Sequence, residues 1–234
     1  MSLTEGIIMF ESKYNKLLTI VLIVVIVSIL GLLGFLAFNF FQEQNNTEQA
    51  SNFVDNYSGD DMIPENNNNN ENNQNTQENQ TNPLDEINEV STGSGNTRRT
   101  RKTYNGFYVA GTIRIPTTNV SYPVLEDLSK SALENSVVMI YGAGLNQVGN
   151  TVIIGHNYRN GQFFSNNKKL NEGDKVYIKD NSGSEKTYTI YSKFETTPED
   201  TSFYQRDTNG RAEITLSTCT DDSSARLILL AKEE

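Results

Sequence analysis

A run of 22 uncharged residues, Leu17 to Phe38, constrains this chain more than any other stretch of its sequence. As an α-helix with a rise of 1.5 Å per residue it would span about 33 Å, which matches the roughly 30 Å hydrocarbon core of a bilayer. The apolar region of a cleaved signal peptide is shorter, about 7–15 residues, and no small-x-small site ends this run. We therefore predict a transmembrane signal anchor over residues 17–38.

Charges beside this run predict its orientation. Lys13 and Lys16 precede it, whereas Gln42 and Glu43 follow it. Positively charged flanks stay in the cytoplasm. Residues 1–16 are therefore expected to form a cytoplasmic N-terminus, with the rest of the chain outside, as in a single-pass type II protein of the cell membrane.

The segment after the anchor is acidic and rich in asparagine and glutamine. Residues 42–96 contain eleven acidic residues and no lysine or arginine, and residues 66–70 are five consecutive asparagines. So few apolar residues cannot bury enough surface to offset the entropy of ordering, so we predict a disordered tether over residues 39–103. Residues 97–234 have 17 basic against 16 acidic residues, which argues against a nucleic-acid partner.

Residues 104–234 form the predicted folded domain. Short β-favouring runs recur about every ten residues with little helix between them, which is typical of a closed barrel or a sandwich. Short helices are expected over residues 129–134 and 163–170. The candidate strands are Phe107–Ile115, Val120–Leu125, Val137–Tyr141, Thr151–His156, Lys175–Lys179, Lys186–Phe194, Ala212–Thr218 and Arg226–Ala231.

Three residues at predicted strand ends carry the groups that a thiol nucleophile needs. Cys219 is the only cysteine, His156 is the only histidine, and Arg226 begins the strand that follows Cys219. A thiol beside a cation ionises readily. An imidazole can protonate a leaving amine, and a guanidinium can hold a carbonyl oxygen or an oxyanion.

Other interpretations of these residues stay open at this point. Taken singly, Cys219 could be a small buried hydrophobic residue, His156 a structural or surface residue, and Arg226 an ion-pair residue. One cysteine excludes an intramolecular disulfide. A closed metal site needs about four ligands, and this chain offers two candidates, so we predict no metal and no cofactor. The residues alone leave a thiol enzyme and a structural barrel equally open.

The run Thr215-Leu216-Ser217-Thr218-Cys219 resembles the TLxTC signature of the sortases, the cysteine transpeptidases of Gram-positive surfaces. Gly155-His156-Asn157 is similar to the motif around that family's catalytic histidine, and Arg226 stands where its arginine follows the cysteine. The anchor and tether fit the family's layout. The resemblance implies a mostly β fold with a closed eight-stranded sortase barrel. It makes Cys219 the nucleophile, His156 the acid and base, and Arg226 the clamp for an oxyanion or substrate.

The same resemblance implies the reaction. Cys219 would cleave a sorting motif near the C-terminus of a secreted protein and hold it as a thioacyl enzyme, which an amine, usually on a peptidoglycan precursor, would resolve. Ser217 and Thr218 are expected to shape the floor of the substrate groove, and Asn157 to orient His156. The expected partners are secreted proteins with a C-terminal sorting motif, an acceptor amine of the cell wall, and the membrane.

The subclass is suggested by spacing and motif. Six residues separate Cys219 from Arg226, and together with the Leu-Ser-Thr-Cys motif and Asn157 they look most like class B sortases. No long helix is expected between the strands at 186–194 and 212–218, where class B members usually insert one, so a class A or class D-like role stays open. Two alternative functions also stay open: a membrane-tethered cysteine peptidase that uses water, and a non-catalytic surface β-barrel that binds a partner.

Overall fold

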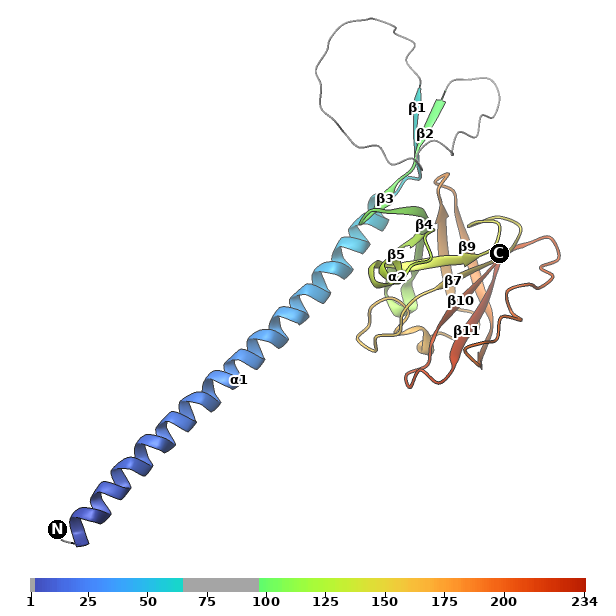
Figure 1. Cartoon of the computed structure of the whole chain (residues 1–234). Helices are drawn as coiled ribbons and strands as arrows, with labels where there is room; N and C mark the ends of the chain where they lie inside the picture. Colours follow the sequence, from blue (N-terminus) through green and yellow to red (C-terminus); the bar gives the residue numbers. More distant parts are fainter. Residues whose placement is uncertain (1–2, 65–96) are drawn as a thin grey trace, which may run out of the picture.

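The computed structural model describes residues 3–64 and 97–234 of the chain. It places a long helix, α1 (Leu3–Asn56), before a β-barrel built from the C-terminal part of the chain (Figure 1). Residues 65–96 of the predicted tether lie outside the described residues. The barrel carries the cysteine, the histidine and the arginine singled out above, so its construction decides where they meet.

Short strands dominate residues 97–234. The helix predicted over residues 129–134 is α2 (Lys130–Asn135), whereas the one predicted over 163–170 contains only a single 3-10 turn at Asn167–Lys169. A second 3-10 turn lies at Pro116–Thr118. The strands are β1 (Asp61–Pro64), β2 (Thr97–Thr100), β3 (Thr103–Tyr104), β4 (Phe107–Ile115), β5 (Val120–Leu125), β6 (Val137–Tyr141), β7 (Gly149–Ile154), β8 (Lys175–Asp180), β9 (Glu185–Thr196), β10 (Ala212–Cys219) and β11 (Arg226–Glu233).

Eight of these strands close into a barrel. Their order around the ring is β4-β5-β6-β7-β10-β11-β9-β8, and β4 pairs with β8 to complete it, with Ile113 opposite Ile178. The pairs β5–β6 and β7–β10 are parallel, and the other neighbours are antiparallel. The predicted closed eight-stranded barrel is confirmed.

Branched apolar side chains fill the inside of the barrel. Ile113, Ile153, Ile178 and Leu216 come from four different strands, and each has 0% of its surface exposed. Because alternate residues of a strand point to opposite faces, burial of these side chains fixes the register of each strand. The register in turn decides which residues meet at the strand ends.

The predicted strand ends agree with the structure to within a few residues, with one difference that matters for the site. The strand predicted over residues 151–156 is β7, which ends at Ile154, so His156 follows the strand rather than ending it. The chain leaves the sheet at Gly155, where a Cβ atom would lie 2.9 Å from the side chain of Phe164. The loop that carries His156 is therefore packed tightly against the barrel.

The N-terminal helix corrects the predicted tether. Disorder was expected from residue 39, but α1 remains helical as far as Asn56, and β1 and β2 then pair as an antiparallel ribbon. Ala50 and Val54 are 1% and 2% exposed, and Tyr57 is 4% exposed. Ala50 and Val54 are four residues apart and so lie on one face of α1, and Tyr57 follows directly after the helix ends. Ala50 and Tyr57 join the core of the barrel, which is why this polar segment is ordered.

The first part of α1 has a different character. Within the described residues, one helical stretch is long and apolar enough to cross a membrane, and it belongs to α1. All side chains from Leu17 to Phe38 are exposed and make no apolar contact with the barrel core. The apolar stretch, Lys16–Asn56, contains the predicted anchor over residues 17–38.

Candidate active site

Cys219 and Arg226 face each other across two neighbouring strands. Cys219 is the last residue of β10, Arg226 is the first residue of β11, and the two are directly paired in the antiparallel register. Directly opposed residues project their side chains from the same face of a sheet. Both residues are half-buried, and the thiol is free. The prediction that the two lie at the same end of the sheet is confirmed.

The guanidinium of Arg226 has donors to spare. Its Nη1 donates to the carbonyl oxygen of the neighbouring Ala225 at 3.1 Å. No carboxylate in the described residues forms an ion pair with it. Since a guanidinium has five N–H donors, it can bind an anionic or carbonyl oxygen next to the thiol.

The residue before His156 ties the histidine loop to β10. Gly155 donates its N–H to the carbonyl oxygen of Ser217 at 3.2 Å, so the parallel pairing of β7 with β10 continues one residue beyond β7. The carbonyl oxygen of Gly155 accepts a hydrogen bond from Thr218 Oγ1 at 2.8 Å. His156 therefore follows directly after a residue that is bonded to the two positions preceding the cysteine.

The residue after His156 is tied to the cysteine itself. Asn157 Nδ2 donates to the carbonyl oxygen of Cys219 at 2.9 Å and to Oδ1 of Asp221 at 3.0 Å. His156 thus lies between two anchored neighbours, at the same end of the sheet as the thiol. The side chain of Asn157 is engaged with the backbone of β10, which suits the orienting role predicted for it better than a contact with substrate.

Ser217 and Thr218 lie on opposite faces of β10, because successive strand residues alternate. Ser217 shares the outer face with Cys219. Thr218 lies on the same face as Leu216, which belongs to the barrel core, and Thr218 is only 4% exposed. Ser217 therefore lies on the face that carries the thiol and is 7% exposed, whereas Thr218 is turned toward the barrel core and fixes the histidine loop.

Few charged groups influence His156. Burial lowers the pKa of His156 below its ordinary value, and the carboxylate of Glu134 on α2 opposes that shift with a smaller rise. Burial thus favours the neutral imidazole. Among the described residues, no three histidine, cysteine, aspartate or glutamate side chains gather into a group that could hold a metal ion.

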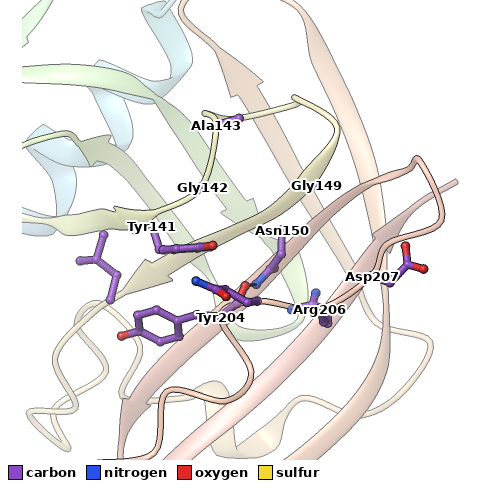
Figure 2. Close-up of a pocket in the computed structure, with 10 residues that line it drawn as sticks. Tyr141, Gly142, Ala143, Gly149, Asn150, Tyr204, Arg206 and Asp207 are labelled. Atoms are coloured by element: carbon purple, nitrogen blue, oxygen red, sulfur yellow. Dashed lines mark hydrogen bonds between the residues drawn. The ribbon is translucent and has the colours of Figure 1, made fainter.

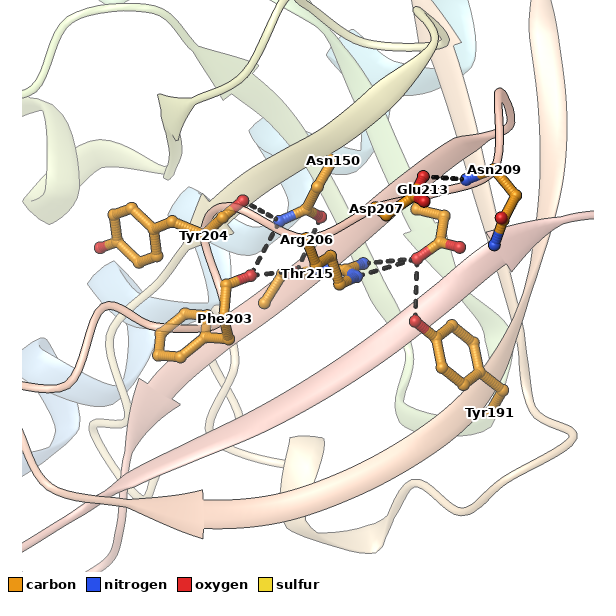
Figure 3. A network of polar contacts seen from close by, with 9 residues as sticks. All are labelled: Asn150, Tyr191, Phe203, Tyr204, Arg206, Asp207, Asn209, Glu213 and Thr215. Atoms are coloured by element: carbon orange, nitrogen blue, oxygen red, sulfur yellow. Dashed lines mark hydrogen bonds and ion pairs between the residues drawn. The ribbon is translucent and has the colours of Figure 1, made fainter.

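A polar network that the sequence analysis missed fixes the connection between β9 and β10 against the outer face (Figure 3). Arg206 pairs with Glu213 at 2.8 Å and donates to Thr215 Oγ1 at 2.7 Å, while the hydroxyl of Tyr191 donates to Glu213 at 2.8 Å. Asn150 on β7 donates to two carbonyl oxygens of the connection at 3.1 and 3.0 Å. The one signal in the sequence was Glu213, an acidic residue inside a predicted strand.

An apolar cluster separates this network from the thiol. Val152 and Ile228 come from β7 and β11, Phe203 comes from the β9–β10 connection, and all three are buried together. The rings of Phe194 and Phe203 meet edge to face at 6.5 Å. The outer face next to Cys219 is therefore apolar and is walled by the connection that the network holds in place.

A pocket of about 830 Å³ opens at the far end of the same face (Figure 2). Tyr141 at the end of β6, Asn150 near the start of β7, and Tyr204 in the β9–β10 connection line it, and the two tyrosine rings lie 5.4 Å apart. β7 runs from Gly149 at this pocket to Ile154 near the histidine loop, which is about 17 Å of strand. The pocket and the thiol therefore occupy opposite ends of one face.

Comparison with known proteins identifies the barrel. Residues 113–234 match the family model of the sortase domain. The chain is 32% identical over 124 residues to Sortase A of Bacillus anthracis, covering 52% of this chain and 58% of that protein. It is 31% identical over 137 residues to Sortase A of Streptococcus agalactiae serotype III (strain NEM316), covering 53% and 52% of the two proteins. The chain thus spans between half and three fifths of the length of these curated relatives.

Solved structures agree with this result. Sortase A from Corynebacterium diphtheriae matches with a TM-score of 0.50 and 29% identity over 58% of this chain and 63% of that one. The complex of Streptococcus agalactiae sortase C1 and MTSET has the same fold, with a TM-score of 0.50 and 24% identity over 54% and 69% of the two chains. Since the matched family model runs from residue 113 to residue 234 and includes the whole candidate site, this chain belongs to the sortase family.

Proposed function

We propose that this chain is a membrane-anchored cysteine transpeptidase that cleaves a C-terminal sorting motif of secreted proteins and transfers them to an amine of the cell wall. The observation that carries the proposal is the direct pairing of Cys219 with Arg226, beside a histidine loop bonded to the same strand. Membership of the sortase family supports it, because the relatives named above are sortases.

In the first half-reaction, the proton of the Cys219 thiol passes to His156, and the resulting thiolate attacks the carbonyl carbon of the scissile peptide bond. The negative charge that develops on the carbonyl oxygen is stabilised by the open donors of Arg226, which stands on the same face as the thiol. The C–N bond then breaks, His156 gives a proton to the leaving amine, and a thioester remains on Cys219. Burial of the imidazole makes its protonated form a stronger acid for this step.

In the second half-reaction, an acceptor amine attacks the carbonyl carbon of the thioester. His156 is now neutral and accepts the proton that the amine loses. The C–S bond breaks, the thiolate of Cys219 is regenerated, and the secreted protein is joined to the acceptor by a new amide bond. Water in place of the amine would give hydrolysis, which is the peptidase alternative.

The sorting motif is proposed to lie along the outer face between the thiol and the pocket. Ser217 lies on the floor beside the thiol, and the β9–β10 connection, which covers the fully buried Val152 and Ile228, forms one wall. The strand length of about 17 Å from Gly149 to Ile154 corresponds to about five residues of extended peptide. The pocket would then receive the side chain farthest from the scissile bond.

Four features bear on the subclass. The Leu216-Ser217-Thr218-Cys219 motif favours class B, as does the spacing from Cys219 to Arg226. Against it, the connection over residues 197–211 contains turns and no α-helix in the described residues, and both curated relatives are named Sortase A. We therefore propose a class A-like enzyme rather than a class B enzyme.

The membrane arrangement is also a proposal. Residues 17–38 would cross the membrane, supported by their length and their exposed apolar side chains. Lys13 and Lys16 would keep residues 1–16 in the cytoplasm. The barrel, as residues 104–234 of a type II protein, would then lie outside the cell, where secreted proteins and cell-wall precursors meet.

The test uses the full chain in detergent micelles with a panel of fluorogenic peptides that represent the known classes of sorting motif. Cys219→Ala is the matched variant, since it removes the chain's only thiol. Cleavage that this substitution abolishes, together with a ligated product when an amine is added, is the expected result. The peptide that is cleaved also decides the subclass.

Other outcomes separate the alternatives. Cleavage without ligation for any amine would establish the peptidase. The non-catalytic surface barrel would be established if Cys219 resists labelling in the folded chain and the chain cleaves none of the peptides. The reason is that a thiol nucleophile must be accessible and partly ionised.

A further inference from the structure

The ring of Tyr158 covers one face of the His156 imidazole. The ring centroids of His156 and Tyr158 lie 4.7 Å apart with an angle of 21° between their planes, which is a stacked arrangement. Stacked rings at this spacing attract each other and restrict rotation about the side-chain bonds. One face of the imidazole is thereby closed to water, although Tyr158 itself is 43% exposed.

Tyr158 is in turn held by a row of rings that begins in the barrel core. Its ring meets that of Phe163 edge to face at 5.8 Å, and Phe163 packs on Tyr122 at 5.1 Å. Phe163 is 6% exposed and Tyr122 on β5 is 3% exposed. The three rings therefore connect the imidazole to a rigid part of the molecule.

The backbone of the loop maintains this row. The N–H of Tyr158 donates to Ser165 Oγ at 3.0 Å, and the N–H of Phe164 donates to the carbonyl oxygen of His156 at 3.1 Å. Phe163 adopts a φ of +49°, which is uncommon for a bulky residue. Such a conformation persists where the surroundings require it, and here it belongs to the loop that closes back on His156.

We propose that Tyr158 is a positioning residue for His156: its ring stacks on the imidazole and holds the imidazole plane at the end of β10 where the thiol of Cys219 lies. The inference rests on the proposed function, in which His156 moves the proton in both half-reactions. Only the ring is needed for this role, because no hydrogen bond from the hydroxyl of Tyr158 to His156 is present in the described structure.

The burial to which the stacked ring contributes lowers the pKa of His156, and the surrounding charges are few. Glu134 on α2 faces both rings and favours the protonated imidazole. Cys219 and Arg226 stand at the neighbouring strand ends, and Asp221 in the β10–β11 loop is reached through Asn157 and is paired with a lysine. Burial outweighs Glu134, so the pKa of His156 lies below its ordinary value of about 6.5. Removing the ring of Tyr158 would expose the imidazole and move its pKa upward.

The test exploits the fact that His156 is the only histidine in the chain. Full-length protein in detergent micelles, labelled only at histidine, gives the signals of one imidazole, so they need no assignment to a residue. Three chains are compared by NMR over a pH titration and by kinetics on the cleaved peptide: wild type, Tyr158→Phe and Tyr158→Ala. Tyr108→Ala is the matched control, because Tyr108 is also 43% exposed but does not stack on the imidazole.

We expect Tyr158→Phe to keep the wild-type imidazole shifts, titration midpoint and kcat. Tyr158→Ala should move the imidazole protons downfield through loss of the ring current, raise the midpoint toward the ordinary value, and lower kcat by up to about 100-fold, since a misplaced catalytic group has effects of that size. Tyr108→Ala should resemble wild type in every measurement.

The NMR measurement tests whether the stack exists, and the kinetic measurement tests whether it matters for the reaction. If the imidazole signal of Tyr158→Ala has wild-type shifts and midpoint, the stack does not exist in solution and the inference is overturned, whatever the activity. If the signal moves but kcat is unchanged, a positioning role is overturned. If the wild-type chain cleaves no peptide while the signal moves as expected, the proposed function fails and the stack stands as a structural contact only.

Discussion

Arg226 combines a permanent charge, a position directly opposite Cys219 and donors that no carboxylate engages in the described residues. A lysine there would keep the charge but lose the planar fork of donors. We expect Arg226→Lys to lower kcat by about 100-fold, with a smaller change in KM, because removal of one oxyanion donor typically lowers kcat by about 10²–10³-fold. Initial-rate kinetics on the cleaved peptide measure this.

The matched control is Arg211→Lys, because Arg211 is an exposed arginine just before β10. It should retain full activity, and both variants should unfold at the wild-type temperature. Equal activity of Arg226→Lys and wild type would show that the guanidinium geometry has no part in the reaction.

Gly155 is constrained by space rather than by chemistry. A Cβ atom there would approach side-chain atoms of Phe164 and Val137 to 2.9 Å, closer than packed atoms tolerate. Gly155→Ala should therefore lower the free energy of unfolding by about 1–3 kcal/mol, the usual effect of overpacking. It should also lower activity, because the next residue is His156. Urea unfolding and peptide kinetics test the two effects.

Gly173→Ala, in the turn before β8 and away from the proposed groove, is the comparison for that result. No atom lies within 4 Å of the Cβ that it would add, so only its positive φ of 96° opposes the change. It should destabilise the chain without the selective loss of activity. A Gly155→Ala chain with wild-type stability and activity would mean that Phe164 and Val137 move aside freely.

At the scale of elements, the β9–β10 connection is held by a nearly buried ion pair. The side chains of Arg206 and Glu213 are only 16% and 10% exposed. Removing one partner of such a pair leaves the other charge uncompensated, so Glu213→Gln should lower the free energy of unfolding by about 3 kcal/mol. Proteolysis within residues 197–211 should accelerate, and KM for the peptide should rise because the groove loses its wall.

A double-mutant cycle with Arg206→Met separates this pair from other effects. The double variant should be less destabilised than the sum of the single variants, by about 1–3 kcal/mol. The exposed pair Lys130 and Glu134 on α2, with 90% and 50% exposed side chains, is the control and should show a coupling energy below about 0.5 kcal/mol. Equal coupling energies for the two pairs would contradict a special role for Arg206 and Glu213.

The barrel strands were predictable because their apolar runs are short, distinct and separated by turn residues. The meeting of Cys219 with Arg226 follows from one tight connection between consecutive strands. The position of His156 does not follow from local pattern, since β7 pairs with β10 in parallel across a long stretch of intervening chain. Only the family resemblance indicated it. The network around Glu213 was missed for a similar reason, because it joins the irregular β9–β10 connection to side chains of β7, β9 and β10.

At the scale of the whole molecule, the link between the proposed membrane span and the barrel is helical. Residues 39–56 would be about 27 Å long as an α-helix, whereas a flexible coil of 55 residues would have a root-mean-square span of about 40 Å and no fixed direction. Average composition concealed this, because few residues of the segment are apolar, and two of these, Ala50 and Val54, are spaced for one helix face. α1 therefore holds the barrel at a fixed distance from the proposed membrane span (Figure 1).

The chain just after α1 completes the attachment. The N–H of Asp60 donates to the carbonyl oxygen of Asn181 at 2.8 Å, and Lys179 Nζ donates to the carbonyl oxygen of Tyr57 at 3.3 Å. Gly59 lies so close to the β8–β9 turn that a Cβ there would approach the nitrogen of Gly183 to 2.6 Å. Residues 50–60 are thus part of the folded unit.

A fragment of residues 97–234 should therefore be less stable than one of residues 44–234, although both contain the whole barrel. The longer fragment keeps the buried contacts of Ala50, Val54 and Tyr57, and burial of one large apolar side chain is worth about 1.5–3 kcal/mol. We expect its Tm to be higher by about 5–10 °C. Val54→Ala in the longer fragment should lose part of this gain, and Asn52→Ala, on the exposed face of α1, should lose none. Equal Tm values for the two fragments would instead mean that α1 ends as an independent element and that the barrel is free to move relative to it.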